Sequence, residues 1–369
     1  MAAALLVGLA GCTSAPEAAP GPSTPPTPSP TATTTLPTAA PEQVGLDPDR
    51  LAAAVRRARA QGSSCFVVVR EGRVVAEHYW GDGSASQPAA VFSVTKSAAS
   101  TLVGIAQSDG DLDVDDPAAA YVPAWRGTPA EEVTVRNLLA NDSGREWSPE
   151  SDYSRLVYAR NRTAYAVGLA QEHPPGQVWA YNNAAIQTLD RVLRSATGED
   201  PADFASERLF APLGMADTRL TADAGGRSTG MAFGMESTCL DLARFGLLFQ
   251  QEGRWGDDQL VPASWVREAT GRSSQGLNSA YGLLWWLNRA GPVRAPIDQA
   301  TPSGLPGVVR QGRLVPGAPA DLYAALGLGG QVVMVHPGSA TVVVRLGAPV
   351  LSDLDRYTLG DAARVLTGE

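Results

Sequence analysis

The feature that most constrains the fold of this 369-residue chain is the presence of β-type segments near both ends of its folded part. In the N-terminal part, β-branched and apolar residues at 65–69 and 74–80 flank a short turn, which predicts a hairpin. In the C-terminal part, the segments 321–327, 331–335 and 340–346 predict three further short strands. The two sets are more than 200 residues apart, so any sheet that contains both must be closed by long-range pairing.

The residues between these strands have mostly helical patterns, broken by Gly and Pro, over about 97–270. Helices are also expected at 47–62, before the hairpin, and at 353–366. We therefore expect a mixed α/β fold of the α+β type, in which helices flank an antiparallel sheet built from both chain ends and a mostly helical subdomain is inserted. Residues 287–320 are rich in Gly, Pro and Arg and predict a long surface loop.

The N-terminal segment has a different composition. Residues 1–12 are apolar and end in Leu9-Ala10-Gly11-Cys12, which is typical of the lipobox of a bacterial lipoprotein signal peptide. We expect its positively charged beginning to lie upstream of Met1; an apolar N-terminus of a cytosolic protein is the alternative. Residues 13–41 are almost entirely Ala, Pro, Ser and Thr and predict an extended linker. The domain at 42–369 is then extracytoplasmic and anchored to the bacterial cell membrane by a lipid at Cys12.

The remaining cysteines and the charges limit what the domain binds. Once Cys12 is lipidated, Cys65 and Cys239 are left, and in an exported protein they either form a disulfide or stay as buried free thiols. The net charge is −9 and no run of basic residues occurs, which argues against a nucleic-acid partner. The three histidines are scattered along the chain, so we predict neither a metal site nor a cofactor.

The chain contains a single lysine. Lys and Arg together number 29, yet only Lys96 is a lysine, and it follows Ser93 by three residues. A guanidinium cannot give up its proton in a protein, whereas a buried ammonium can shift its pKa toward neutrality. On a helix that begins at Ser93 both side chains share one face, and the helix N-terminus offers the Ser93 amide to a developing oxyanion. The pattern predicts a serine nucleophile beside a lysine base.

A second element carries Tyr181 and Asn183 within the segment 175–183. With Ser93 and Lys96 it resembles the S-x-x-K and Y-x-N motifs of the serine β-lactamase and penicillin-binding-protein superfamily. The similarity is greatest to the class C-like branch of esterases, D-aminopeptidases and aminohexanoate-dimer hydrolases. It covers nearly all of residues 44–350 and includes the stretches Val135–Leu139, Pro212–Met215, Asp241–Gly246 and Tyr281–Trp286.

The family's third motif, a K-T-G-like triplet on a strand, falls on Ala325, Leu326 and Gly327 and lacks its lysine. In the family that lysine helps to bind the carboxylate of β-lactams and of D-Ala-D-Ala peptides, so its absence argues against activity on them. The stretch 327–331 looks more like that of the aminohexanoate-dimer hydrolases. The resemblance also implies that the Leu328 amide is the second oxyanion donor, beside that of Ser93.

The resemblance implies acyl transfer to Ser93 from a small ester or amide substrate. Either neutral Lys96 or Tyr181 as tyrosinate accepts the serine proton, and Asn183 belongs to the same site. Two alternatives remain, a D,D-carboxypeptidase or β-lactamase and a catalytically silent, membrane-anchored binding lipoprotein on the same fold. A G-x-S-x-G match around Ser228 is interpreted as chance, because no buried strand precedes it. A Ser-His-Asp triad would need one of the histidines, and no context singles out any of them: His78, His173 and His336.

Overall fold

The computed structural model describes residues 1, 35–272, 276–294, 309–349 and 357–367. Residues 2–12 of the predicted signal peptide, with Cys12, and most of the predicted linker lie outside the described residues, as does the start of the predicted helix at 353–366. Residues Thr33–Glu369 form one compact unit. Among the described residues, no helix has the length and apolar character needed to span a membrane.

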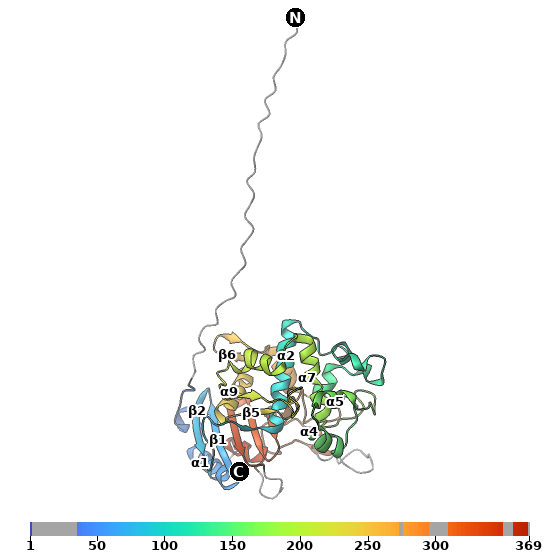
Figure 1. Cartoon of the computed structure of the whole chain (residues 1–369). Coiled ribbons are helices and arrows are strands. Elements are labelled where there is room, and N and C mark those ends of the chain that lie inside the picture. The colour runs from blue at the N-terminus through green and yellow to red at the C-terminus, as the bar shows by residue number, and fades with distance from the viewer. Residues whose placement is uncertain (2–34, 273–275, 295–308, 350–356, 368–369) are drawn as a thin grey trace. The chain divides into compact units, whose positions relative to one another are not determined.

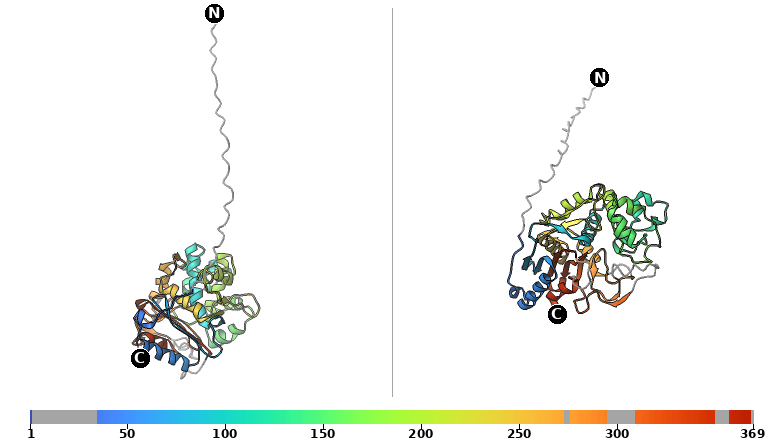
Figure 2. Two further views of the ribbon diagram at one scale, coloured as in Figure 1. Left: turned by 90° about the vertical axis from the view of Figure 1, so that its left-hand side faces the viewer. Right: turned by 60° about the horizontal axis from the view of Figure 1, so that its bottom comes forward.

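A six-stranded antiparallel sheet forms the centre of this unit, in the order β2-β1-β13-β12-β11-β8. The N-terminal hairpin therefore pairs directly with the last strand, and the blue and red ribbons of Figure 2 lie side by side. The predicted sheet built from both chain ends is confirmed. Its strands are β1 (Ser63–Arg70), β2 (Arg73–Tyr79), β8 (Trp286–Leu287), β11 (Tyr323–Gly327), β12 (Gln331–His336) and β13 (Thr341–Gly347).

Strands β1, β12 and β13 are buried on both faces of the sheet, which explains why they are almost continuously apolar rather than alternating. In β1, Val67 and Val69 point into one apolar core, whereas Phe66 and Val68 point into another. The Phe66 face is covered by α1 (Pro48–Ala60) and α11 (Leu359–Thr367), and Figure 1 shows α1 beside β1. The opposite face is covered by α9 (Cys239–Gln250), which contacts β1, β12 and β13.

The regular structure between β2 and β8 is mostly helical, and α2 (Thr95–Asp109) is the central helix of this part. The inserted helical subdomain predicted from the sequence is therefore present. Its other helices are α3 (Val135–Ala140), α4 (Leu156–Tyr158), α5 (Arg162–Gly168), α6 (Asn183–Gln187), α7 (Leu189–Thr197), α8 (Pro201–Ala205) and α10 (Ala263–Gly271). Short strands accompany them: β3 (Ala89–Ala90), β4 (Arg219–Leu220), β5 (Met235–Ser237), β6 (Arg254–Trp255) and β7 (Asp258–Gln259).

Two segments differ from the sequence-based expectation. The helical pattern expected over about 97–270 is broken not only at Gly and Pro but also at Thr188, between α6 and α7. The Thr188 hydroxyl donates back to the carbonyl of Ala184 at 3.3 Å and so competes with regular helix geometry. The loop expected at 287–320 contains the paired strands β9 (Gly291–Val293) and β10 (Arg310–Gly312). The local sequence of these Gly- and Pro-rich stretches does not predict strands, because they pair with each other from distant positions in the chain.

Candidate active site

Ser93 lies in a short 3-10 turn, η2 (Phe92–Val94), that leads directly into α2. Lys96 is the second residue of α2, and its side chain is only 1% exposed. Its Nζ donates a hydrogen bond of 2.8 Å to the Ser93 hydroxyl, so the structure brings the predicted pair together. Phe92 has a φ of 49°, which is rare for a bulky residue and marks a strained backbone just before the serine.

Two further acceptors surround the Lys96 ammonium. Nζ donates to Oδ1 of Asn183 at 2.7 Å and to the carbonyl of Ala232 at 2.8 Å. Asn183 is placed by the first turn of α6, whose N-cap Asn182 accepts a hydrogen bond from Ala185 N at 2.8 Å. Burial lowers the pKa of Lys96 to about 7, and the negative charge of Asp152 opposes this change.

Tyr181 forms the third side of the site. Its ring stacks on Trp286, with the ring centres 5.7 Å apart, and meets Tyr281 edge-on at 5.9 Å. The Lys96 Nζ lies 4.8 Å from the centre of the Tyr181 ring. Burial raises the pKa of Tyr181 strongly, although a hydrogen bond with Ser93 opposes the rise. Tyr181 is therefore a neutral phenol at neutral pH, in contact with the serine hydroxyl.

Asp152 also belongs to this cluster, and no sequence motif marks it. It lies in the π-helical turn η6 (Ser151–Arg155), is 1% exposed and accepts three hydrogen bonds. The donors are Asn183 N at 2.9 Å, Asn183 Nδ2 at 2.7 Å and Ala184 N at 2.8 Å. Burial raises the pKa of Asp152, while these donors and the Lys96 charge favour the carboxylate. Because Asp152 and Asn183 are far apart in sequence, only the fold reveals the contact.

The third-motif triplet Ala325, Leu326 and Gly327 ends strand β11, which packs against η2. A Cβ on Gly327 would lie 2.3 Å from the carbonyl oxygen of Val91, two residues before Ser93. The missing side chain thus permits a very close approach of β11 to the serine turn. Leu328 follows directly and is 51% exposed. Its role as an oxyanion donor stays a prediction that this approach supports.

The competing serine, Ser228, is in a different environment. It is 2% exposed, donates a short hydrogen bond to Asp223 and accepts one from Thr163 N at 3.3 Å. Ala222 and Thr229 form only an isolated bridge around it, not the strand and helix of a nucleophile elbow. Within the described part of the chain, no group of His, Cys, Asp and Glu side chains is arranged to hold a metal ion.

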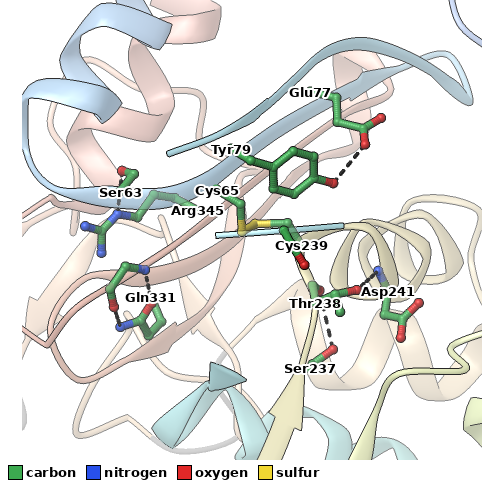
Figure 3. Close-up of a disulfide and its surroundings, with 12 residues drawn as sticks. Ser63, Cys65, Glu77, Tyr79, Ser237, Thr238, Cys239, Asp241, Gln331 and Arg345 are labelled. Carbon is green, nitrogen blue, oxygen red and sulfur yellow. Dashed lines mark hydrogen bonds between the residues drawn. A yellow bond between two sulfur atoms is a disulfide. The ribbon is translucent and has the colours of Figure 1, made fainter. Parts of the chain in front are cut away.

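Cys65 and Cys239 are joined by a disulfide with a Cα–Cα distance of 6.3 Å. Figure 3 shows Cys65 on β1 meeting Cys239 at the first turn of α9, next to the N-cap Thr238. Both cysteines are buried, at 4% and 0% exposure. The bond links the hairpin strand β1 to α9, which covers the face of the sheet opposite Phe66.

Comparison with known proteins places this arrangement in a family. Residues 49–352, more than half of the chain, match the family described as Beta-lactamase. The chain is 24% identical over 255 residues to the 6-aminohexanoate-dimer hydrolase of Paenarthrobacter ureafaciens, an alignment that covers 61% of this chain. It spans 64% of that hydrolase, which is slightly less than two thirds of its length.

Solved structures show the same fold. A family VIII carboxylesterase superimposes with a TM-score of 0.63 at 15% identity, covering 86% of this chain and 94% of the esterase. A D-alanine carboxypeptidase from Burkholderia cenocepacia superimposes with a TM-score of 0.58 at 20% identity, covering 87% and 97%. The expected β-lactamase-like fold is confirmed. The matched span and the common fold show that this chain belongs to the Beta-lactamase family, as a class C-like serine hydrolase.

Proposed function

We propose that this serine hydrolase cleaves an ester or amide bond of a small substrate through an acyl-enzyme on Ser93. The observation that carries the proposal is the set of three acceptors around Lys96 Nζ: Ser93 Oγ, Asn183 Oδ1 and the Ala232 carbonyl. An ammonium group donates three hydrogen bonds and so satisfies all three. After losing one proton, the amine keeps two N–H groups and gains one lone pair.

The chemistry of the three partners decides where that lone pair points. The Asn183 Oδ1 and Ala232 oxygens can only accept, so they retain the two N–H groups. Ser93 is the one partner with a proton to give, and the lone pair therefore faces its hydroxyl. With the pKa of Lys96 lowered to about 7, a large fraction of the side chain is in this basic form at neutral pH.

In the proposed reaction, Ser93 Oγ bonds to the substrate carbonyl carbon as its proton passes to Lys96. Neutral Tyr181 donates its proton to the leaving oxygen or nitrogen as the scissile bond breaks, and the Lys96 ammonium returns a proton to Tyr181. The amides of Ser93 and Leu328 hold the oxyanion. Water then attacks the acyl carbon and gives its proton to Lys96 and Tyr181, and Ser93 leaves with a proton returned by these two residues.

The surroundings favour an uncharged, partly apolar substrate. The strand that carries the third motif presents Ala325, Leu326 and Gly327, none of which can pair with a substrate carboxylate. Around Tyr181 the site is aromatic, with Trp179, Tyr281 and Trp286 in mutual ring contact. The named relatives include a 6-aminohexanoate-dimer hydrolase and a carboxylesterase, in keeping with this choice.

Two measurements test the proposal. A fluorophosphonate probe should label the wild-type protein but not Ser93→Ala, and the protein should hydrolyse a short-chain aryl ester far faster than nitrocefin. Labelling that persists in Ser93→Ala, or that is lost in Ser228→Ala, would contradict the assignment of Ser93 as the nucleophile. Comparable kcat/KM values for the ester and for nitrocefin would contradict the proposed substrate class.

We also propose that the domain acts outside the cytoplasm, anchored through Cys12. The apolar segment ending at Cys12 and the Pro-rich linker support this placement, and a buried disulfide between Cys65 and Cys239 is typical of proteins from oxidising compartments. Metabolic labelling with a fatty acid in a bacterial host, with both chains expressed behind a complete signal-peptide start, should mark the full chain but not Cys12→Ser. Equal labelling of both chains, or of neither, would contradict the anchor.

A further inference from the structure

The orientation of the Asn183 side chain is a condition for the proposed base. Its Oδ1 faces Lys96 at 2.7 Å, and its Nδ2 faces Asp152 at 2.7 Å. If the amide were turned by 180°, Nδ2 would donate to Lys96 and occupy the lone pair of the neutral amine. The amine would then direct an N–H toward Ser93 and could not accept its proton.

Asp152 removes that ambiguity, because an ionised carboxylate only accepts hydrogen bonds. Its Oδ2 receives both Asn183 N and Asn183 Nδ2, while Oδ1 receives Ala184 N. These bonds hold the carboxylate against the first turn of α6, so the amide nitrogen of Asn183 must point to it. A neutral residue at 152 would not enforce this direction, because an amide both donates and accepts.

The charge of Asp152 also acts on Lys96. A negative charge nearby favours the ammonium and raises the pKa of Lys96 against the effect of burial. The other titratable groups facing this pair are tyrosines: Tyr181 beside Ser93, Tyr153 on the same turn as Asp152, and Tyr165 on α5. Tyr153 also forms a side-chain hydrogen bond with Asn183, but a hydroxyl both donates and accepts and so does not fix the direction of the amide. Burial raises the pKa of all three tyrosines, so they stay neutral through the neutral pH range.

We propose that Asp152 is a positioning residue of this site, which holds the Asn183 amide in the one orientation that leaves the Lys96 lone pair facing Ser93. This inference rests on the proposed function. Asp152 touches no reacting atom itself; it acts through Asn183.

The test is the pH profile of aryl-ester hydrolysis by Asp152→Asn. We expect kcat/KM to fall by about tenfold or more, mainly through kcat, because the base is misdirected. We also expect the acid limb of the profile to move by about one pH unit toward lower pH, because the charge that favoured the ammonium is gone. A purely structural loss would lower the rate without moving the limb.

A matched control separates this role from the general loss of a buried carboxylate. Asp241 lies on α9 and is 3% exposed. It accepts hydrogen bonds from Asp217 N at 3.0 Å and from the Thr218 hydroxyl at 2.9 Å. Asp241→Asn should lower the thermal midpoint but keep the wild-type acid limb. A wild-type rate and limb in Asp152→Asn, or the same limb shift in Asp241→Asn, would overturn the inference.

A second variant decides the matter if Asp152→Asn does not fold, as judged by circular dichroism. Asp152→Glu keeps the charge but displaces the carboxylate by one methylene, so the limb should stay in place while kcat falls. Full wild-type activity of Asp152→Glu would then refute the positioning role. Ser93→Ala is measured in parallel. If ester hydrolysis by the wild-type protein does not depend on Ser93, the proposed function is refuted. If the wild-type protein is active and the Asp152 variants are equally active, only this inference is refuted.

Discussion

At the scale of single residues, Lys96 obtains its chemistry from its neighbours. Burial destabilises its charge, and two carbonyl acceptors direct its remaining N–H groups away from Ser93. An arginine at this position keeps its proton at any accessible pH. We therefore expect Lys96→Arg to be nearly as inactive as Lys96→Ala, with kcat/KM for an aryl ester reduced by about 100-fold or more. Thermal unfolding of both variants controls for folding. Substantial activity in a folded Lys96→Arg would mean that Lys96 supplies only a charge or packing and is not the base.

The pH dependence distinguishes the two candidate bases. A base works only in its deprotonated form, so activity is lost as the pH falls through its pKa. With Lys96 as base, kcat/KM should rise with pH around a midpoint near 7. With Tyr181 as base the midpoint would lie well above the usual pKa of a phenol, because burial raises the pKa of Tyr181. A profile of kcat/KM on an uncharged ester measures the midpoint, and an acid limb confined to strongly alkaline pH would contradict the lysine mechanism.

At the scale of elements, we expect the position of the end of β11 to determine whether the Leu328 amide can act as the predicted oxyanion donor. Gly327→Ala places a methyl group against the Val91 carbonyl, where a Cβ would lie at 2.3 Å, and so pushes the strand away from η2. Losing one oxyanion donor costs about 100-fold in kcat. Steady-state kinetics on the ester should show this loss. Gly271→Ala, at the end of α10, is the matched control and should behave as wild type, because outside its own helix and chain neighbours no atom of the described residues lies within 4 Å of the added Cβ. Equal kcat values in the two variants would contradict a role of β11 in placing an oxyanion donor.

At the scale of the whole molecule, the disulfide links residues 174 positions apart. Closing a loop of this length restricts the unfolded chain and contributes about 5 kcal/mol in the loop-entropy model. The Cys65→Ala/Cys239→Ala variant should therefore unfold at a lower urea concentration and a lower temperature than wild type. Non-reducing mass spectrometry of the unfolded wild type supplies the control. Two alkylatable thiols there, or an unchanged unfolding midpoint, would contradict a stabilising bond.

Some of this organisation follows from the sequence alone. The apolar segments of β1, β12 and β13 are buried on both faces, so their composition was sufficient to predict strands within the sheet. The spacing of Ser93 and Lys96 predicts a shared face because three residues span almost one helical turn. The pairing of 291–293 with 310–312 was not predictable, because neither stretch carries a local strand signal.

What the sequence by itself determined is the set of chemical groups: one lysine, a serine three residues before it, and a Tyr-x-Asn segment. Only the tertiary structure decided which atoms face one another. Asp152 meets Asn183 across 31 positions, and the Ala232 carbonyl meets Lys96 across 136. The first contact arises where the η6 turn packs against α6, and the second where the turn between β4 and β5 meets the start of α2. Local periodicity describes a residue's own helix or strand, whereas the direction of a hydrogen bond in a buried site depends on partners that packing brings from elsewhere.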